Sequence, residues 1–161
     1  MKISIVYDSR TGHTAKAAEY IIEGAEKVQG VEAKAFNIDD IDEDFVKDSC
    51  ALIVGTPTYN GYLTGKMKLW LENDLKKYNV GGKLGGAYAT AGYIHGGGDL
   101  AIQCILTHLM VGGMMTYSGG HVKGKPVIHL GPVAISENMD DFAELFRIYG
   151  QRMAEQAAVL N

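Results

Sequence analysis

The sequence predicts a three-layer α/β fold in which helices cover both faces of a five-stranded parallel sheet, doubly wound in the order 2-1-3-4-5. Three observations support this prediction. Short apolar runs alternate along the chain with longer stretches whose apolar residues recur at helical spacing. Parallel neighbours need helical crossovers between them, so this alternation favours a parallel sheet. The length of 161 residues suits such a sheet better than a six-stranded dinucleotide-binding fold.

Each expected strand is a short apolar run. Residues 3–7 are apolar at nearly every position, which is typical of a strand buried on both faces. Residues 31–38 begin with an alternation of apolar and charged side chains, as in a strand with one exposed face. Residues 126–135 look extended and indicate additional strand structure rather than disorder. The remaining strands are expected at residues 50–55, 83–90 and 114–118.

The helical stretches each have one apolar face. The clearest is the last, where apolar residues recur at the helical period over residues 142–160. The stretch at residues 14–29 is followed by Gly30, and glycine is the residue that most often ends a helix. The acidic residues 39–48 hold a short helix at most. Further helices are expected at residues 64–76 and 99–111.

A single domain over residues 1–161 is expected, because this length forms one ordinary core and no linker or repeat divides it. The chain is 47% hydrophobic and 21% charged, which is the balance of a globular protein in water. It has no run of about 18 apolar residues to span a bilayer, and residues 3–7 are too short for a signal peptide. We therefore expect a cytoplasmic protein without membrane insertion.

The charge of the chain and the spacing of its histidines and cysteines indicate that it binds neither nucleic acid nor a metal ion. A formal net charge of −4, with no basic stripe, predicts no nucleic-acid partner. Cys50 and Cys104 form no CxxC pair and lie among apolar residues, which indicates reduced core thiols. His108, His121 and His129 lack the spacing of metal ligands, so no metal site is expected.

The loops at one edge of the sheet hold the residues best suited to bind a ligand. Ligands of an open parallel sheet bind beyond the carboxyl ends of the strands, where the strand order reverses. In the order 2-1-3-4-5, that point lies between the first and third strands. Residues 8–14, 56–63 and 91–98 should meet there, so we expect the site at this edge.

The first of these loops joins a strand to a helix. It offers hydroxyl groups and backbone N–H groups at a helix start, which together suit a phosphate dianion. Neither G-x-x-x-x-G-K-[ST] nor G-x-G-x-x-G describes it. An ordinary helix cap rich in Ser and Thr is the alternative interpretation. The residues expected at the phosphate are Ser9, Arg10, Thr11, Gly12, His13 and Thr14.

These motifs resemble those of a known family. The pattern Ser-x-Thr-Gly-x-Thr at residues 9–14 resembles the [TS]-x-T-G-x-T loop of flavodoxins, which binds the FMN phosphate. Residues 55–61 resemble the second flavin loop, most closely that of the flavodoxin-like NAD(P)H:quinone oxidoreductases of the tryptophan-repressor-binding-protein type. Residues 65–71 and the glycine-rich residues 90–98 are similar to the same group. The resemblance implies a flavodoxin-like fold with FMN as cofactor, and it extends over the chain up to Ser118.

The resemblance also implies roles around the flavin ring. Tyr59 and Tyr93 would stack on the ring or flank it, with plain packing as the alternative. His95 is a candidate catalytic proton relay, since histidine titrates near neutral pH, or else it caps its loop. The flavin-ring residues so assigned are Pro57, Thr58, Tyr59, Asn60, Gly61, Thr90, Ala91, Gly92, Tyr93, His95 and Gly96.

The leading functional hypothesis is an FMN-dependent oxidoreductase that uses NAD(P)H to reduce a quinone or a similar acceptor by two-electron chemistry. The alternatives are a flavodoxin-type carrier of single electrons between redox proteins and an accessory flavoprotein domain of a larger complex. The short chain and the complete phosphate loop support the carrier. The apolar residues 100–115 exceed what one buried helix face needs, which predicts a homo-oligomer, a dimer or tetramer.

Overall fold

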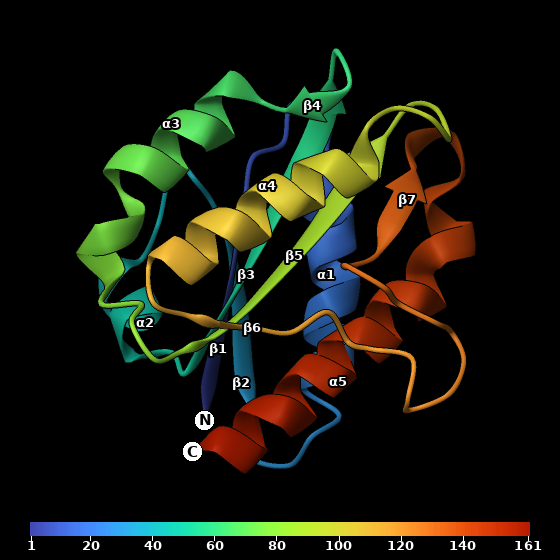
Figure 1. The fold of residues 1–161 in the computed structure, drawn as a ribbon. Helices are drawn as coiled ribbons and strands as arrows, with labels where there is room; N and C mark the ends of the chain where they lie inside the picture. The colour runs from blue at the N-terminus through green and yellow to red at the C-terminus, as the bar shows by residue number, and fades with distance from the viewer.

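The computed structural model describes residues 1–161 and confirms the expected α/β architecture (Figure 1). Its strands are β1 (Lys2–Tyr7), β2 (Glu32–Asn37), β3 (Ala51–Tyr59), β4 (Tyr62–Leu63), β5 (Leu84–Ala91), β6 (Met115–Thr116) and β7 (Val133–Ile135). Its helices are α1 (His13–Ala25), α2 (Glu43–Asp48), α3 (Gly65–Asn73), α4 (Gly98–Val111) and α5 (Ala143–Leu160), with 3₁₀ segments η1 (Leu75–Tyr78) and η2 (Ser136–Phe142). No helix is both long and apolar enough to cross a membrane.

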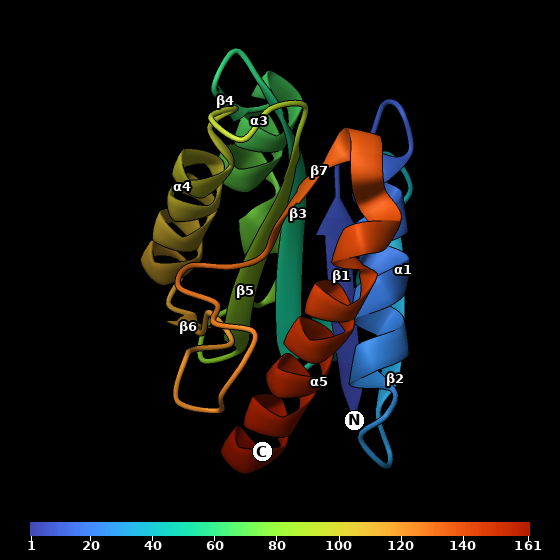
Figure 2. The ribbon, with the colours of Figure 1, turned by 90° about the vertical axis from the view of Figure 1, so that its right-hand side faces the viewer.

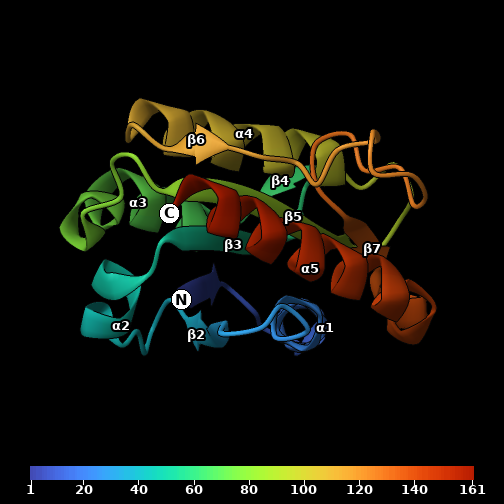
Figure 3. The ribbon, with the colours of Figure 1, turned by 90° about the horizontal axis from the view of Figure 1, so that it is seen from below.

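The sheet has the predicted strand order. β2, β1, β3, β5 and β6 are neighbours in that sequence, which corresponds to 2-1-3-4-5 (Figure 3). β1 pairs in parallel with both β2 and β3, so Tyr7 at its end lies opposite Asn37 on one side and Gly55 on the other. Because β5 is also parallel to β3, the carboxyl ends of these strands meet at one edge of the sheet.

Helices cover both faces of the sheet, with α1 and α5 on one side and α3 and α4 on the other (Figure 2). Successive side chains of a strand point to opposite faces, and β1 divides its residues accordingly. Ile3 and Ile5 are fully buried in the layer under α1 and α5, and Val6 is fully buried in the opposite layer. Burying one such side chain contributes about 1.5–3 kcal/mol, so each layer is a substantial core.

The third strand is longer than the predicted residues 50–55. It continues to Tyr59 and turns back into β4, which pairs Thr58 with Leu63 and Tyr59 with Tyr62. Asn60 and Gly61 form the two-residue turn with φ of 53° and 76°. Positive φ at both positions is the type I′ geometry that matches the twist of a hairpin. Most of the expected second loop, residues 56–63, is therefore a β-hairpin.

The other differences concern element lengths. The first helix ends at Ala25 rather than near residue 29, and the fifth strand is confined to Met115–Thr116 instead of residues 114–118. The additional strand expected within residues 126–135 is present only as β7 at its end. β5 is long enough to pair with β6 near its start and with β7 near its end, so neither partner covers its whole length.

Glycines allow α1 and α5 to cross closely. A Cβ on Gly24 would lie 1.9 Å from the carbonyl oxygen of Arg147, and one on Gly150 would lie 2.1 Å from that of Ile21. Real side chains never approach backbone so closely, which means that the two helix backbones are in direct contact. The Arg147 side chain reaches back across this contact to Glu23, with Nε 2.6 Å from the carboxylate.

Replacing Gly150 by alanine should destabilise the protein, because the helices must separate to admit the new Cβ. Overpacking of this kind costs about 1–3 kcal/mol, which thermal unfolding of the apoprotein measures. The matched control is Gly65→Ala at the start of α3, where nothing lies within 4 Å of the added Cβ. That change should leave the stability unchanged or raise it slightly. Equal effects of the two substitutions would contradict the close helix contact.

Candidate functional site

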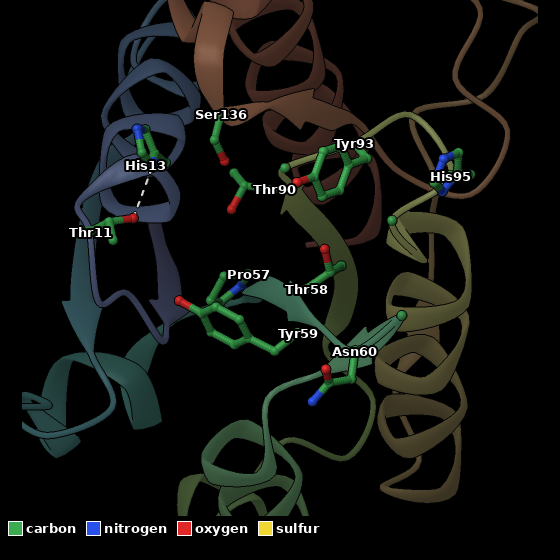
Figure 4. A pocket seen from close by; sticks show the side chains of 13 residues that line it. Thr11, His13, Pro57, Thr58, Tyr59, Asn60, Thr90, Tyr93, His95 and Ser136 are labelled. Atoms are coloured by element: carbon green, nitrogen blue, oxygen red, sulfur yellow. Dashed lines mark hydrogen bonds between the residues drawn. The ribbon is translucent and has the colours of Figure 1, made fainter.

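A cleft of about 580 Å³ opens at the carboxyl edge of the sheet, between the ends of β1, β3 and β5 (Figure 4). Its volume is typical of small-molecule and cofactor sites, which run from about 300 to 1,000 Å³. All of its lining residues except Thr90 and Ser136 come from the loops that were expected to meet there: Thr11, His13, Pro57, Thr58, Tyr59, Asn60, Gly61, Thr90, Gly92, Tyr93, His95, Gly96 and Ser136.

The first loop presents unpaired hydrogen-bond donors. No backbone N–H of residues 9–14 donates a hydrogen bond within the chain. These groups stand at the start of α1, where Gly12 takes a φ of 91° that only glycine adopts without strain. The positive end of the helix dipole adds to them. The donor set fits a phosphate group, whose oxygens accept hydrogen bonds.

Three predicted phosphate residues are absent from the cleft lining and make contacts within the protein. The Thr14 side chain is fully buried, and its hydroxyl is bonded to that of Thr90 at 2.8 Å. Ser9 Oγ accepts a 3.4 Å hydrogen bond from the Ala15 N–H. The Arg10 guanidinium lies 4.8 Å from the centroid of the Tyr59 ring, which joins the first loop to the second. The sequence motif does not specify the direction in which these side chains point.

Polar contacts fix the second loop to the first. The Thr64 hydroxyl donates a 2.6 Å hydrogen bond to the Asp8 carboxylate, and both residues are buried. The Thr64 oxygen also accepts from the Met67 N–H at 3.1 Å, which caps α3. The Thr64 N–H in turn points to the Thr56 hydroxyl at 3.3 Å. One threonine thus ties together the end of β1, the entry to the hairpin and the start of α3.

The third loop packs on the hairpin through glycine backbone. Gly97 has a φ of 88°, and a Cβ there would lie 2.0 Å from the Gly61 carbonyl oxygen. The Tyr93 side chain is 72% exposed at the cleft and stacks on the His95 ring, with 6.1 Å between centroids. Ala91, although predicted at the cofactor, is buried and does not line the cleft.

Ser136 lines the cleft and was missed by the sequence analysis. It directly follows β7, whose parallel pairing with β5 brings its carboxyl end to the same edge of the sheet. The extended residues before it were the available signal. That signal did not say which strand they would join.

The cleft is lined mainly by neutral side chains and by glycine backbone. Its lining includes no carboxylate, lysine or arginine side chain. Beneath it, burial raises the pKa of Tyr88 well above its usual value, so this tyrosine stays neutral. No group of three or more histidine, cysteine, aspartate or glutamate side chains is placed to hold a metal ion.

Comparison with known proteins identifies the family to which this site belongs. The profile of the flavodoxin family matches residues 5–106. A flavodoxin from Clostridium saccharobutylicum is 45% identical over 156 residues, which cover 97% of each chain. The chain belongs to the flavodoxin family. The fold of this flavodoxin is similar to a solved flavodoxin from the domain Archaea, with a TM-score of 0.81 and 23% identity over 98% of this chain and 99% of that one.

A quinone-reducing enzyme is a more distant relative of this flavodoxin. The NAD(P)H dehydrogenase (quinone) of Methanosarcina barkeri is 28% identical over 145 residues, which cover 68% of this chain and 66% of that protein. The sequence motifs pointed to this enzyme group most closely. The sequence identity of the Clostridium flavodoxin to this chain is instead much higher than that of the quinone dehydrogenase.

Replacing Thr64 by alanine should cost about 2–4 kcal/mol of unfolding free energy. The change removes the cap of α3 and leaves the buried Asp8 carboxylate without its hydroxyl donor. Urea unfolding measures the loss. The matched control is Asp42→Ala, which removes only an exposed cap of α2 and should cost about 1 kcal/mol. Equal losses for the two variants would show that the Asp8–Thr64 bond contributes nothing.

Proposed function

We propose that this flavodoxin binds FMN in the cleft and carries single electrons between redox proteins, with residues 1–161 acting as one FMN-binding domain. The observation that carries the proposal is the loop of residues 9–14, whose backbone N–H groups are free at the start of α1. Such a loop suits a phosphate dianion. FMN, the cofactor of flavodoxins, ends in a phosphate and supplies the redox chemistry when it is bound.

We assign the flavin ring to the second and third loops. Tyr59 and Tyr93, exposed by 38% and 72%, offer aromatic faces on the two sides of the cleft. Aromatic packing of this kind contributes about 0.5–1.5 kcal/mol beyond the area buried. The contact of Gly97 with Gly61 holds the two loops at a fixed separation. A flat ring therefore enters a space whose walls are already in place.

Similarity supports the carrier over the enzyme. The Clostridium relative matches nearly the whole chain and is named a flavodoxin, whereas the quinone dehydrogenase matches at lower identity over a smaller share. Reduction of a quinone by NAD(P)H, the leading hypothesis from the motifs, becomes our second candidate. It has the distant relative in its favour, together with His95 on the rim of the cleft as the proton relay.

The free thiols also support a location. Cys50 and Cys104 are unpaired. Reduced cysteines are the rule in the cytoplasm, which is where we propose that the protein works.

The apoprotein should bind FMN about 100-fold or more tightly than riboflavin, because hydrogen bonds to a charged group contribute about 1.5–3 kcal/mol each. Titration of the apoprotein with each flavin, followed by the quenching of flavin fluorescence, measures both dissociation constants. Free adenosine monophosphate serves as a control for general phosphate binding. Equal affinity for FMN and riboflavin would rule out the phosphate role of residues 9–14.

The FMN-loaded protein should oxidise NADH or NADPH with benzoquinone no faster than free FMN does, since a carrier needs no site for a nicotinamide. Steady-state absorbance at the nicotinamide band measures the rate. Turnover far above the free-cofactor rate, and lost in His95→Asn, would support the reductase and contradict the carrier. Retention of that turnover in His95→Asn would leave the enzyme without its assigned relay.

We also propose that the chain forms a homo-oligomer through the outer side of α4. Leu100, Met110 and Val111 are exposed by 52%, 53% and 85% there, and apolar exposure gathered on one element marks an interaction surface. Sedimentation of the FMN-loaded protein should show a dimer or tetramer, which Val111→Lys shifts toward the monomer. The control is Val159→Lys on α5, a site exposed by 78%, which should have no effect. A monomeric wild type at micromolar concentration would contradict the proposal.

A further inference from the structure

Tyr88 is fully buried beneath the first turn of α1, although it belongs to β5. It stands opposite Gly55 of β3 in the strand register, and a Cβ on Gly55 would lie 2.0 Å from the Tyr88 Cζ atom. The glycine therefore makes room for the ring. The ring also meets Phe146 edge-on, with 5.8 Å between centroids. With its ring held in this way, the Tyr88 hydroxyl points toward α1.

The hydroxyl reaches a peptide that is shared with the first loop. Tyr88 donates a 3.0 Å hydrogen bond to the Thr14 carbonyl oxygen. The other end of the same peptide is the Ala15 N–H, which donates to Ser9 Oγ at 3.4 Å. A hydrogen bond to a peptide carbonyl polarises the peptide and strengthens its N–H as a donor. One lone pair of the Ser9 oxygen thus accepts a hydrogen bond from the helix, which leaves the Ser9 O–H free to donate to another group.

Two features stabilise the hydrogen bond between Tyr88 and the Thr14 carbonyl oxygen. Burial raises the pKa of Tyr88 well above its usual value, so the hydroxyl keeps its proton at any physiological pH. A second bond from β5 holds the same residue of α1, because the Thr90 and Thr14 hydroxyls lie 2.8 Å apart. The first turn of the helix is therefore fixed to the strand by both the backbone and the side chain of Thr14.

We propose that Tyr88 is a positioning residue of the phosphate loop, whose buried hydroxyl sets the Thr14–Ala15 peptide and, through it, the orientation of Ser9 before a phosphate arrives. The inference rests on the proposed FMN site. Tyr88 does not line the cleft, so it acts only through its neighbours. Its effect is confined to ligands that carry the phosphate.

The test compares two tyrosines that lose the same atom. Tyr88→Phe removes the bonded hydroxyl, and Tyr149→Phe removes a hydroxyl that is equally buried but makes no hydrogen bond to α1 or to the first loop. Each apoprotein is titrated with FMN and with riboflavin, after thermal unfolding has shown that it is folded. Tyr88→Phe should weaken FMN binding about three- to tenfold, the worth of one ordinary hydrogen bond, and leave riboflavin binding unchanged. Tyr149→Phe should change neither.

A double-mutant cycle with Ser9→Ala separates positioning from a general effect on the core. In the Ser9→Ala background, Tyr88→Phe should weaken FMN binding less than about twofold, because the group through which it acts is gone. An undiminished effect there, or equal losses in Tyr88→Phe and Tyr149→Phe, would overturn the inference and leave the FMN site standing. A wild type that binds FMN and riboflavin equally would instead overturn the proposed site, and the inference with it.

Discussion

The site depends on one constraint: β1 and β3 lie side by side in parallel, while the helices that follow them leave toward opposite faces of the sheet. The pairing of Tyr7 with Gly55 brings the end of β1 beside the middle of β3, which continues past it to Tyr59. α1 then turns toward α5, and α3 turns toward α4 (Figure 2). The space between the diverging chains is the cleft. Strand order alone creates it, and the loop residues decide what it binds.

Contacts between the loops turn that space into a fixed shape. The Gly61–Gly97 backbone contact holds the hairpin against the third loop, and the Asp8–Thr64 bond holds the hairpin to the first. The Tyr88 contact adds the start of α1 to the same frame. A site whose walls are already ordered loses little conformational freedom when a ligand enters, which increases the affinity obtained from each contact.

The sequence predicts the fold well because the signals of the fold are local and repeated. Each buried strand and each amphipathic helix carries its own pattern, and parallel pairing needs helices between strands. The hairpin could also have been predicted from the sequence, because Asn60-Gly61 is a dipeptide that strongly favours a two-residue hairpin turn. The loop of residues 9–14 lies at a helix start, as predicted, because its glycine and hydroxyl residues stand together directly before an amphipathic stretch.

What the sequence does not predict are contacts between distant segments. Ser136 reaches the cleft only because the three-residue strand β7 joins the end of β5, and so short a segment has no strong signal of its own. The Thr14 hydroxyl was assigned to the phosphate, yet its position in the first turn of α1 directs it to Thr90. The motif identifies the loop, whereas the packing of α1 on β5 decides which of its groups face the cleft.

The central claim is that FMN in this cleft exchanges electrons one at a time, as a carrier requires, and not in pairs, as a nicotinamide-dependent reductase does. A potentiometric titration of the FMN-loaded protein, followed by its visible absorption, measures this directly. We expect two separate one-electron steps whose potentials differ by well over about 59 mV, the interval that corresponds to a tenfold change in a one-electron equilibrium. A single two-electron step would contradict it.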